Sequence, residues 1–243
     1  SYLSLESLNI YSPKMKAIFE EIEKDKKQLV IVYSQYRNVE GLEIFSRVLN
    51  ENGYQKYSKK SNKNYDYKRY GFYSGKENIK ERDEMIDAYT NTSNKYGKDV
   101  RILLISSAGA EGLDLKNIRE IHIIDPWFHL FRVEQIIGRG IRFCSHMGLE
   151  KKKRNVTIYQ HVGISAKSEN ESVDIFIYRQ AEQKARKIGN IEHILKQNSI
   201  DCLLNKGLNV ITKENVIFYA ISFTLAYGAS NFFLANSDTS AIG

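Results

Sequence analysis

Cysteine is scarce in this sequence, and Cys144 and Cys202 are the two cysteines among 243 residues. Two isolated thiols argue against a disulfide-stapled scaffold and fit a reducing compartment. No CxxC pair and no cluster of cysteine with histidine occurs, so the spacing of a zinc site is missing and we expect no metal site. The N-terminus lacks a basic start followed by an apolar run, so a signal peptide is not expected.

Acidic residues are fewer than basic ones. The chain carries 36 Lys and Arg against 29 Asp and Glu, which gives a formal net charge of +7. A basic balance favours nucleic acid or another polyanion as a partner, although a lysine-rich solvated surface would give the same number. Hydrophobic residues make up 42% and charged residues 27% of the chain, which is typical of a soluble globular protein with a sizeable core.

Apolar runs predict an α/β protein. Continuous runs at 29–33, 70–73, 102–105 and 121–124 predict buried parallel strands, and an alternating run at 156–162 predicts one more. Helical spacing separates these runs, beginning at Ser12 and Pro13, which are favourable N-cap and first helical residues. Strands that alternate with helices predict a parallel sheet flanked by helices.

We expect four parts along the chain. They are a lead-in and linker helix at 1–28, an α/β lobe at 29–165, a helical appendage at 166–207 and an apolar tail at 208–243. Residues 1–10 are predicted to be extended. Within the tail, residues 216–235 carry no charge over about the length of a membrane span. Scattered polar residues there favour a buried or domain-docking helix pair, and a membrane anchor is the alternative.

Residues 101–146 contain the most specific pattern. A predicted strand leads into a loop of small residues with the sequence SSAGAEGLD, a second strand follows, and a helix then carries Gln135, Arg139 and Arg142. At i, i+4 and i+7 these three side chains are predicted to share one helical face. Planar guanidinium groups suit phosphate oxygens. Gly138 and Gly140 each cost a helix about 1 kcal/mol relative to alanine, so we expect a ligand or a facing backbone to approach closely there.

These motifs resemble those of superfamily 2 helicases. The run QIIGRGIR at 135–142 is similar to motif VI of that family, and SSAGAEGLDL at 106–115 is similar to motif V. Their order and spacing resemble the second RecA-like lobe, the helicase C-terminal domain, over about residues 11–205. The run RFCSHMGLEKKKRNV and the segment 172–205 look like helicases and transcription ATPases of large cytoplasmic DNA viruses, of the poxvirus and asfarvirus type.

The resemblance implies roles for individual residues. ATP with Mg would bind between two lobes, where Arg139 and Arg142 would act as catalytic arginine fingers and Gln135, Gly112 and Asp114 would contact the nucleotide. Single- or double-stranded nucleic acid would contact Ser34, Gln35, Arg37, Ser74, Gly75, Ser106 and Ser107. An N-terminal RecA-like lobe, in cis or in trans, is the implied partner, and RNA polymerase is a further candidate. The implied location is the host cytoplasm or the virion, without a membrane.

Two motifs of an ATP site are missing from the sequence. No GxxxxGK[ST] phosphate loop occurs, and no DExH or DExD follows a strand. The phosphate cradle and the magnesium carboxylate must therefore come from the first lobe, and we expect this chain alone to hydrolyse no ATP at a useful rate. The alternative is a non-catalytic nucleic-acid or polymerase-docking module that binds through Lys151, Lys152 and Lys153. A solvated linker is the simpler interpretation of these lysines.

Overall fold

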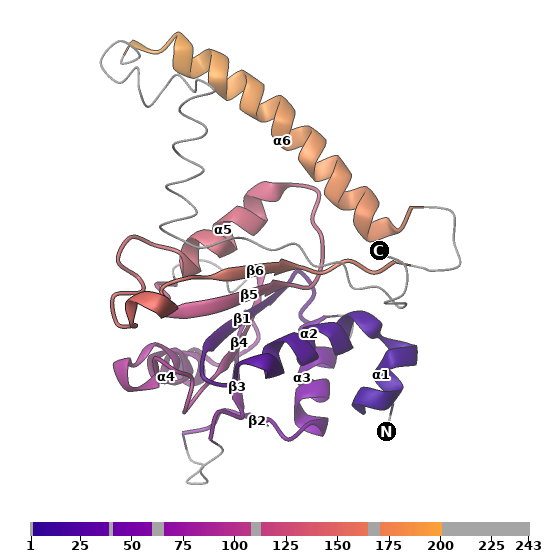
Figure 1. The fold of residues 1–243 in the computed structure, drawn as a ribbon, viewed down its shortest axis with the longest axis vertical. Helices are drawn as coiled ribbons and strands as arrows, with labels where there is room; N and C mark the ends of the chain where they lie inside the picture. The colour runs from indigo at the N-terminus through magenta and orange to yellow at the C-terminus, as the bar shows by residue number, and fades with distance from the viewer. Residues whose placement is uncertain (1, 39–40, 60–65, 108–112, 165–170, 201–243) are drawn as a thin grey trace.

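The computed structural model describes residues 2–38, 41–59, 66–107, 113–164 and 171–200. Six parallel strands form one sheet in the order β2-β3-β4-β1-β5-β6 (Figure 1). The strands are β1 (Leu29–Ser34), β2 (Gln55–Lys56), β3 (Arg69–Tyr73), β4 (Ile102–Ser106), β5 (Ile118–Ile123) and β6 (Thr157–Gln160). The α/β parallel sheet expected from the sequence is therefore confirmed.

Helices cover both faces of the sheet (Figure 1). They are α1 (Leu5–Tyr11), α2 (Pro13–Lys24), α3 (Leu42–Glu51), α4 (Ile79–Thr90), α5 (Leu130–Gly140) and α6 (Val173–Gln197). Val30 and Val32 of β1 pack with the buried residues of α2 and α3, while Ile31 and Tyr33 pack with those of α4 and α5. Alternate side chains of a strand point to opposite faces, so β1 contributes to two apolar layers and forms the centre of the core.

The N-terminal region differs in one respect from the sequence-based expectation. Residues predicted to be extended form the helix α1, in which Ser4 caps the backbone N–H of Ser7 and Leu8 is buried. A seven-residue helix with one buried side chain gives too few repeats for periodicity to reveal it. The predicted start of the next helix is confirmed, since Pro13 is the first residue of α2.

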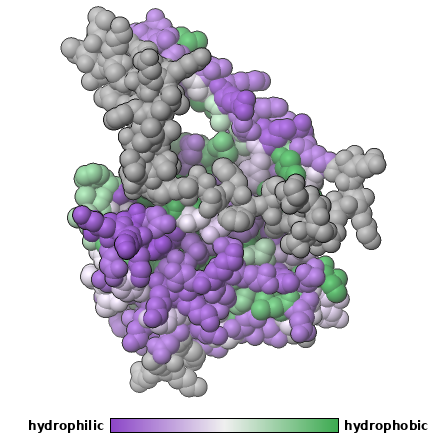
Figure 2. All heavy atoms as spheres, in the orientation of Figure 1, coloured by the Kyte–Doolittle hydropathy of each residue, from purple (hydrophilic) through white to green (hydrophobic). Residues whose placement is uncertain are grey.

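The long helix α6 extends away from the sheet (Figure 1). Its first turn is held by Asp174, whose carboxylate accepts from the Lys14 ammonium at 2.6 Å and from the Gly163 backbone N–H at 2.8 Å. Hydrophilic side chains cover much of the helix in Figure 2. No helix among the described residues is long and apolar enough to cross a membrane. Both predictions for the tail at 208–243 lie outside the described residues.

A polar cluster is buried between β5 and β6. His122 has no solvent exposure, and its Nδ1 lies 3.0 Å from Nε2 of His161. Its ring stacks on Tyr159 with the centroids 4.7 Å apart, and the Glu120 carboxylate lies 3.4 Å from its Nε2. Burial lowers the pKa of both histidines, so both rings are neutral in the folded chain.

Candidate functional site

Polar residues meet at the carboxyl-terminal edge of the sheet, which we call the strand-end edge. Ser34 ends β1 opposite Ser106, the last residue of β4, while Ser74 follows β3 and Asp125 follows β5. The Ser34 hydroxyl donates to the Asp125 carboxylate and accepts from the backbone N–H of Tyr36 at 3.0 Å. These contacts fix the loop that leaves the central strand. Ligands of open α/β sheets commonly bind at such an edge.

The serines of this edge are turned toward the protein. Ser34 and Ser74 have no solvent exposure, and Ser106 is 3% exposed. Their contact with nucleic acid stays a prediction, and in this arrangement all three serines are buried. Ser34 and Ser74 hold the loops at the strand ends in place through hydrogen bonds to Asp125 and Arg37. Gly75 is exposed and Ser107 is half-buried, so these two predicted residues remain accessible.

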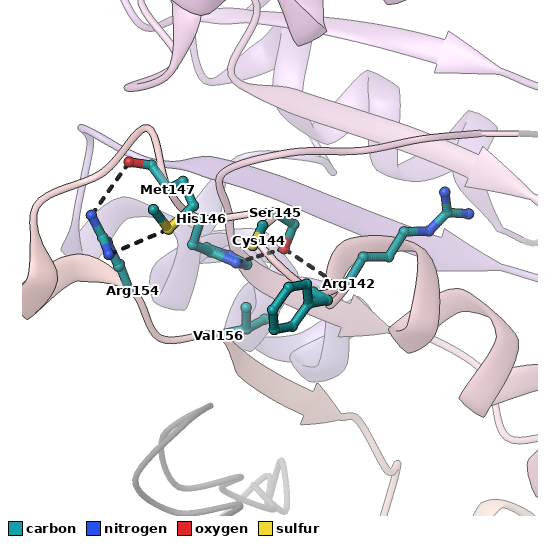
Figure 3. Close-up of a pocket in the computed structure, with 8 residues that line it drawn as sticks. Arg142, Cys144, Ser145, His146, Met147, Arg154 and Val156 are labelled. Atoms are coloured by element: carbon teal, nitrogen blue, oxygen red, sulfur yellow. Dashed lines mark hydrogen bonds between the residues drawn. The ribbon is translucent and has the colours of Figure 1, made fainter.

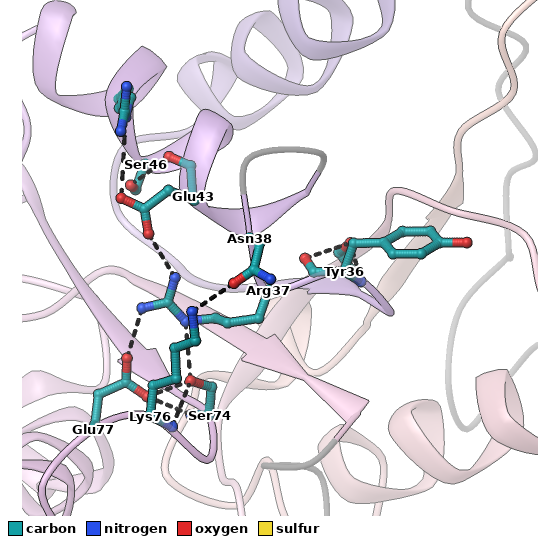
Figure 4. Close-up of polar contacts among 10 residues, drawn as sticks. Tyr36, Arg37, Asn38, Glu43, Ser46, Ser74, Lys76 and Glu77 are labelled. Atoms are coloured by element: carbon teal, nitrogen blue, oxygen red, sulfur yellow. Dashed lines mark hydrogen bonds and ion pairs between the residues drawn. The ribbon is translucent and has the colours of Figure 1, made fainter.

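Arg37 is the centre of a second set of contacts (Figure 4). Its Nε donates to Ser74 Oγ at 3.0 Å, and its two terminal nitrogens donate to Glu43 and Glu77, each at 2.8 Å. The guanidinium carbon also lies 3.9 Å from the centroid of the Phe72 ring. The side chain thus ties the loop after β1 to the loop after β3 and to α3. We call this group the Arg37 network.

The charges of the Arg37 network are paired with one another. Burial raises the pKa of Glu77, but hydrogen bonds from Ser74 and Arg37 outweigh it and hold the pKa below its usual range. Glu77 is therefore ionised at neutral pH, and Glu43 supplies a second partner for the Arg37 cation. Arg37 was predicted to contact nucleic acid. In this structure its charge is already paired, so a phosphate would have to replace a carboxylate.

Gln35 connects the strand-end edge to α5. Its amide nitrogen donates to the Tyr33 hydroxyl at 2.5 Å, and its oxygen accepts from Arg132 at 3.0 Å. The Arg132 guanidinium in turn lies 4.9 Å from the ring centroid of Trp127. Trp127, the single tryptophan of the sequence, is therefore covered by a cation from α5.

The predicted row of Gln135, Arg139 and Arg142 is wrong in one member. Gln135 and Arg139 lie on α5, but the helix ends at Gly140 and Arg142 lies in the turn beyond it. The turn is closed by the backbone N–H of Arg142, which donates to Ser145 Oγ at 3.2 Å. Gln135 is exposed. The Nε of Arg139 is shielded from solvent and has no hydrogen-bond acceptor among the described residues.

Arg142 joins the turn after α5 to the loop that precedes β5. Its terminal nitrogens donate to the Asp114 carboxylate at 2.9 Å and to the Leu113 carbonyl at 3.1 Å. Two of the five guanidinium N–H donors are used in this way, and the side chain is 44% exposed. The remaining donors can meet an incoming anion. Gly112, predicted to lie near the nucleotide, is outside the described residues.

The two glycines of the helix have different surroundings. A Cβ on Gly140 would lie 3.0 Å from Cδ1 of Ile121 and 3.6 Å from Ile118, so its absence lets the end of α5 approach β5 closely. A Cβ on Gly138 would meet nothing within 4 Å. The close neighbours of Gly140 among the described residues are therefore isoleucine side chains of β5, in place of the expected ligand or facing backbone, whereas Gly138 faces open space in the described part of the lobe.

Arg142 and the strand-end edge lie at opposite ends of the sheet. The segment after α5 packs where β5 begins: Asn117 N–H donates to the Ser145 carbonyl at 3.0 Å, and His146 contacts the Ile118 carbonyl at 2.5 Å. A strand of six residues spans about 20 Å, which is the approximate separation of the two regions. Each region can therefore take a different ligand.

A pocket of about 340 Å³ opens beside Arg142 (Figure 3). It is lined by Arg142, Phe143, Cys144, Ser145, His146, Met147, Arg154 and Val156. Phe143 is 92% exposed, and burial lowers the pKa of His146. A neutral His146 is consistent with its two roles in packing, since it bonds the Ser145 hydroxyl at 2.8 Å as well as the Ile118 carbonyl.

Comparison with known proteins decides the family. The model of the helicase conserved C-terminal domain matches residues 13–144, which is more than half of the chain. The chain belongs to this family. It resembles the C-terminal lobe of superfamily 2 helicases, and the match contains both α5 with Arg139 and the strand-end edge. We refer to the protein below as the lobe.

Viral proteins are among the relatives of the lobe. A protein of Acanthamoeba polyphaga mimivirus that carries the name of an ATP-dependent RNA helicase is 33% identical over 253 residues, covering 88% of this chain and 22% of the relative. The African swine fever virus termination factor NPH-I homolog is 27% identical over 167 residues, covering 64% of this chain and 24% of its own length. The lobe spans about a fifth to two fifths of the first relatives that it matches.

A solved structure supports the fold. The crystal structure of the C-terminal part of the Fun30 ATPase domain matches with a TM-score of 0.50 and 20% identity, covering 69% of this chain and 44% of that one. At this identity the match concerns the fold alone. It agrees with the parallel sheet and flanking helices of Figure 1, so the lobe is RecA-like.

Sequence reasoning missed several residues that position the site. Asp125 holds Ser34, Glu77 and Glu43 hold Arg37, and Arg132 holds Gln35. Asp125 carried a usable signal, since it directly follows a predicted strand. The glutamates carried none, because Glu43 lies on α3 and Glu77 lies in the loop before α4, where acidic residues are ordinary.

Proposed function

We propose that the lobe is the second half of a nucleic-acid-dependent ATPase that works as a helicase or translocase. ATP binds between this lobe and an N-terminal lobe, which supplies the phosphate loop and the carboxylate that holds Mg. Closing and opening of the two lobes change the grip on a nucleic-acid strand. The names of the relatives, which include an ATP-dependent RNA helicase and a termination factor, support ATP use and a nucleic-acid substrate.

The contact of Arg142 with Asp114 and Leu113 carries this proposal. It places a guanidinium, which is always charged, on the loop that resembles motif V, with three N–H donors left for a phosphate oxygen. Arg142 acts as the main arginine finger and stabilises the negative charge that develops on the γ-phosphate. Arg139 is a second finger, and its Nε makes no hydrogen bond with the described residues. Gln135, Gly112 and Asp114 contact the nucleotide.

The strand-end edge is the proposed surface for nucleic acid. Gln35, Gly75 and Ser107 lie at its accessible surface, while Ser34, Ser74 and Ser106 support them from below. Arg37 contacts a phosphate only when a carboxylate of its network moves away. The four-part division of the chain also remains a proposal, with residues 29–165 as the catalytic lobe. RNA polymerase is a proposed partner.

The test is ATP hydrolysis by the native polypeptide that contains this lobe, with and without single-stranded DNA or RNA. Arg142→Ala is expected to lower the stimulated rate about a thousandfold or more, the usual effect of losing an arginine finger. Arg186→Ala is the matched control, since Arg186 is exposed on α6 and pairs with Glu182. A native rate that neither polymer stimulates, or an Arg142→Ala variant as active as the control, contradicts the proposal.

A further inference from the structure

A group of basic side chains lies at the amino-terminal edge of the sheet, opposite the strand-end edge. Lys95 and Tyr96 follow the short helix η1 (Thr92–Asn94) that precedes β4, and three lysines form the short helix η3 (Lys151–Lys153) that precedes β6. Arg154 follows η3. We call these six residues the Tyr96 patch.

Tyr96 brings the two segments of the patch together. The ammonium groups of Lys95 and Lys153 lie 5.2 Å and 5.1 Å from the centroid of its ring. Lys95 also donates to the Gly148 carbonyl at 3.2 Å, which ties its loop to the turn before η3. Arg154 is held by the Leu149 carbonyl at 2.9 Å. Lys95 and Lys153, from segments more than fifty residues apart, therefore meet at one ring, and the other three cations adjoin Lys153 in the chain.

The charges of the Tyr96 patch are not neutralised within the described lobe. None of its five cations makes an ion pair with any residue that the structure describes, and Lys151 and Lys152 are exposed. By contrast, the exposed Lys24 pairs with Glu21 at 2.6 Å. Like charges held near one ring repel each other, and a polyanion relieves that repulsion.

We propose that the Tyr96 patch binds the phosphate backbone of nucleic acid, at a place separate from the strand-end edge. Lysine ammonium groups are mobile point charges that suit repeating phosphates of any sequence, and the net charge of +7 favours the same partner. The patch and the strand-end edge are about 20 Å apart, the length of a six-residue strand. One polymer of modest length reaches both, so the patch holds the part of the strand that flanks the translocating contact.

A nucleotide and an acidic protein segment fit the patch less well. A single triphosphate meets only part of a surface that contains five cations from two loops. Carboxylates of proteins favour the planar fork of arginine, whereas four of these five cations are lysines. The proposal does not need ATP turnover, so it stands or falls separately from the motor function.

The experiment is a binding titration without nucleotide, using the native polypeptide and fluorescein-labelled 30-mer single strands and 20-bp duplexes at 50–300 mM KCl. The triple variant Lys151→Gln, Lys152→Gln, Lys153→Gln is expected to bind about ten- to a hundredfold more weakly at the lowest salt. Its slope of log affinity against log salt is expected to be shallower by about 2 to 3, because each lost phosphate contact removes about 0.7 to 0.9. The matching Lys→Arg triple is expected to restore both values.

A triple variant on another face is the control. Lys24→Gln, Lys26→Gln, Lys27→Gln removes the same charge from the end of α2 and the residues after it, where Lys24 and Lys26 already have glutamate partners. Circular dichroism checks that each variant is folded. Equal losses in the two triple variants would reduce the effect to net charge and overturn the proposal. Unchanged nucleic-acid affinity, accompanied by lost binding of fluorescent ATP or of an acidic peptide, would overturn it in favour of that ligand.

Discussion

Lowering the pH should destabilise the lobe through His122 and His161, and Glu120 should moderate the loss. Burial lowers the pKa of His122 to about 3 and that of His161 to about 2, where the neighbouring His122 and Lys14 add to the effect. Burial also raises the pKa of Glu120 to about 7. The two shifts have opposite consequences for stability, because one concerns a cation and the other an anion.

The sign follows from proton binding in the two states. Below pH 6.5 the unfolded chain protonates its histidines while the folded lobe keeps these two neutral, so the free energy of unfolding falls with pH. At pH 5 each histidine costs about 2 kcal/mol, which is 1.5 pH units at about 1.36 kcal/mol per unit. This magnitude holds because both folded pKa values lie well below 5. The pair thus costs about 4 kcal/mol.

Glu120 contributes in the opposite direction. Its raised pKa means that the folded lobe takes up a proton before the unfolded chain does, so its contribution is present at low pH and is lost as pH rises through 7. As the pH falls from 8 to 5, Glu120 adds about 2.5 kcal/mol to the free energy of unfolding. Between pH 8 and pH 5, these three groups therefore predict that the free energy of unfolding falls by about 1.5 kcal/mol for the native lobe and by about 4 kcal/mol for Glu120→Gln.

Urea denaturation followed by circular dichroism, from pH 8 to pH 5, measures both numbers. Glu150→Gln is the control, because Glu150 is exposed. Other carboxyl groups change the native lobe and both variants alike, so the difference between the variants isolates Glu120. Parallel pH profiles for Glu120→Gln and Glu150→Gln would refute the reasoning, since Glu120 would then be ionised throughout.

Three further predictions concern single substitutions. Gly41→Ala should lower the free energy of unfolding by about 1–3 kcal/mol, because the new methyl group overlaps the Tyr36 carbonyl oxygen; urea titration would contradict this with an unchanged midpoint. Arg101→Met should cost about 3–5 kcal/mol, since Arg101 is fully buried and its loss removes the ion pair with Glu23 and the hydrogen bonds to the Ile22 and Asp25 carbonyls; a loss below 1 kcal/mol would refute this. Gly138→Ala should raise the melting temperature by removing about 1 kcal/mol of helix penalty, while stimulated ATPase falls if the N-terminal lobe approaches there; equal activity would show that the space stays open.

The sequence predicted most strands to within one to three residues, because continuous apolar runs of this length leave few alternatives to buried parallel strands. It placed Arg142 on α5 wrongly. A helix can end at a glycine, and Gly138 and Gly140 on either side of Arg139 were both possible ends. The helix ends at Gly140, which packs against Ile118 and Ile121.

The interior of the strand-end edge was beyond reach of the sequence. Ser34 meets Asp125 across 91 positions, and Arg37 meets Glu77 across 40, so the partners of these polar groups depend on which strands become neighbours. Periodicity shows which face of an element is buried and says nothing about such distant pairs. The roles assigned to Arg139, Arg142 and their neighbours stay predictions until the ATPase test.

The position of β1 has a consequence for how the chain folds. β1 is the first strand in sequence, yet its two neighbours are β4 and β5, which begin at Ile102 and Ile118. During synthesis its apolar run LVIVYS therefore waits for about seventy residues before a native partner emerges. Such non-local pairing slows folding, and until the pairing forms the apolar strand stays exposed and prone to aggregation. Chain fragments that stop before Ile102 should aggregate instead of forming a smaller stable sheet.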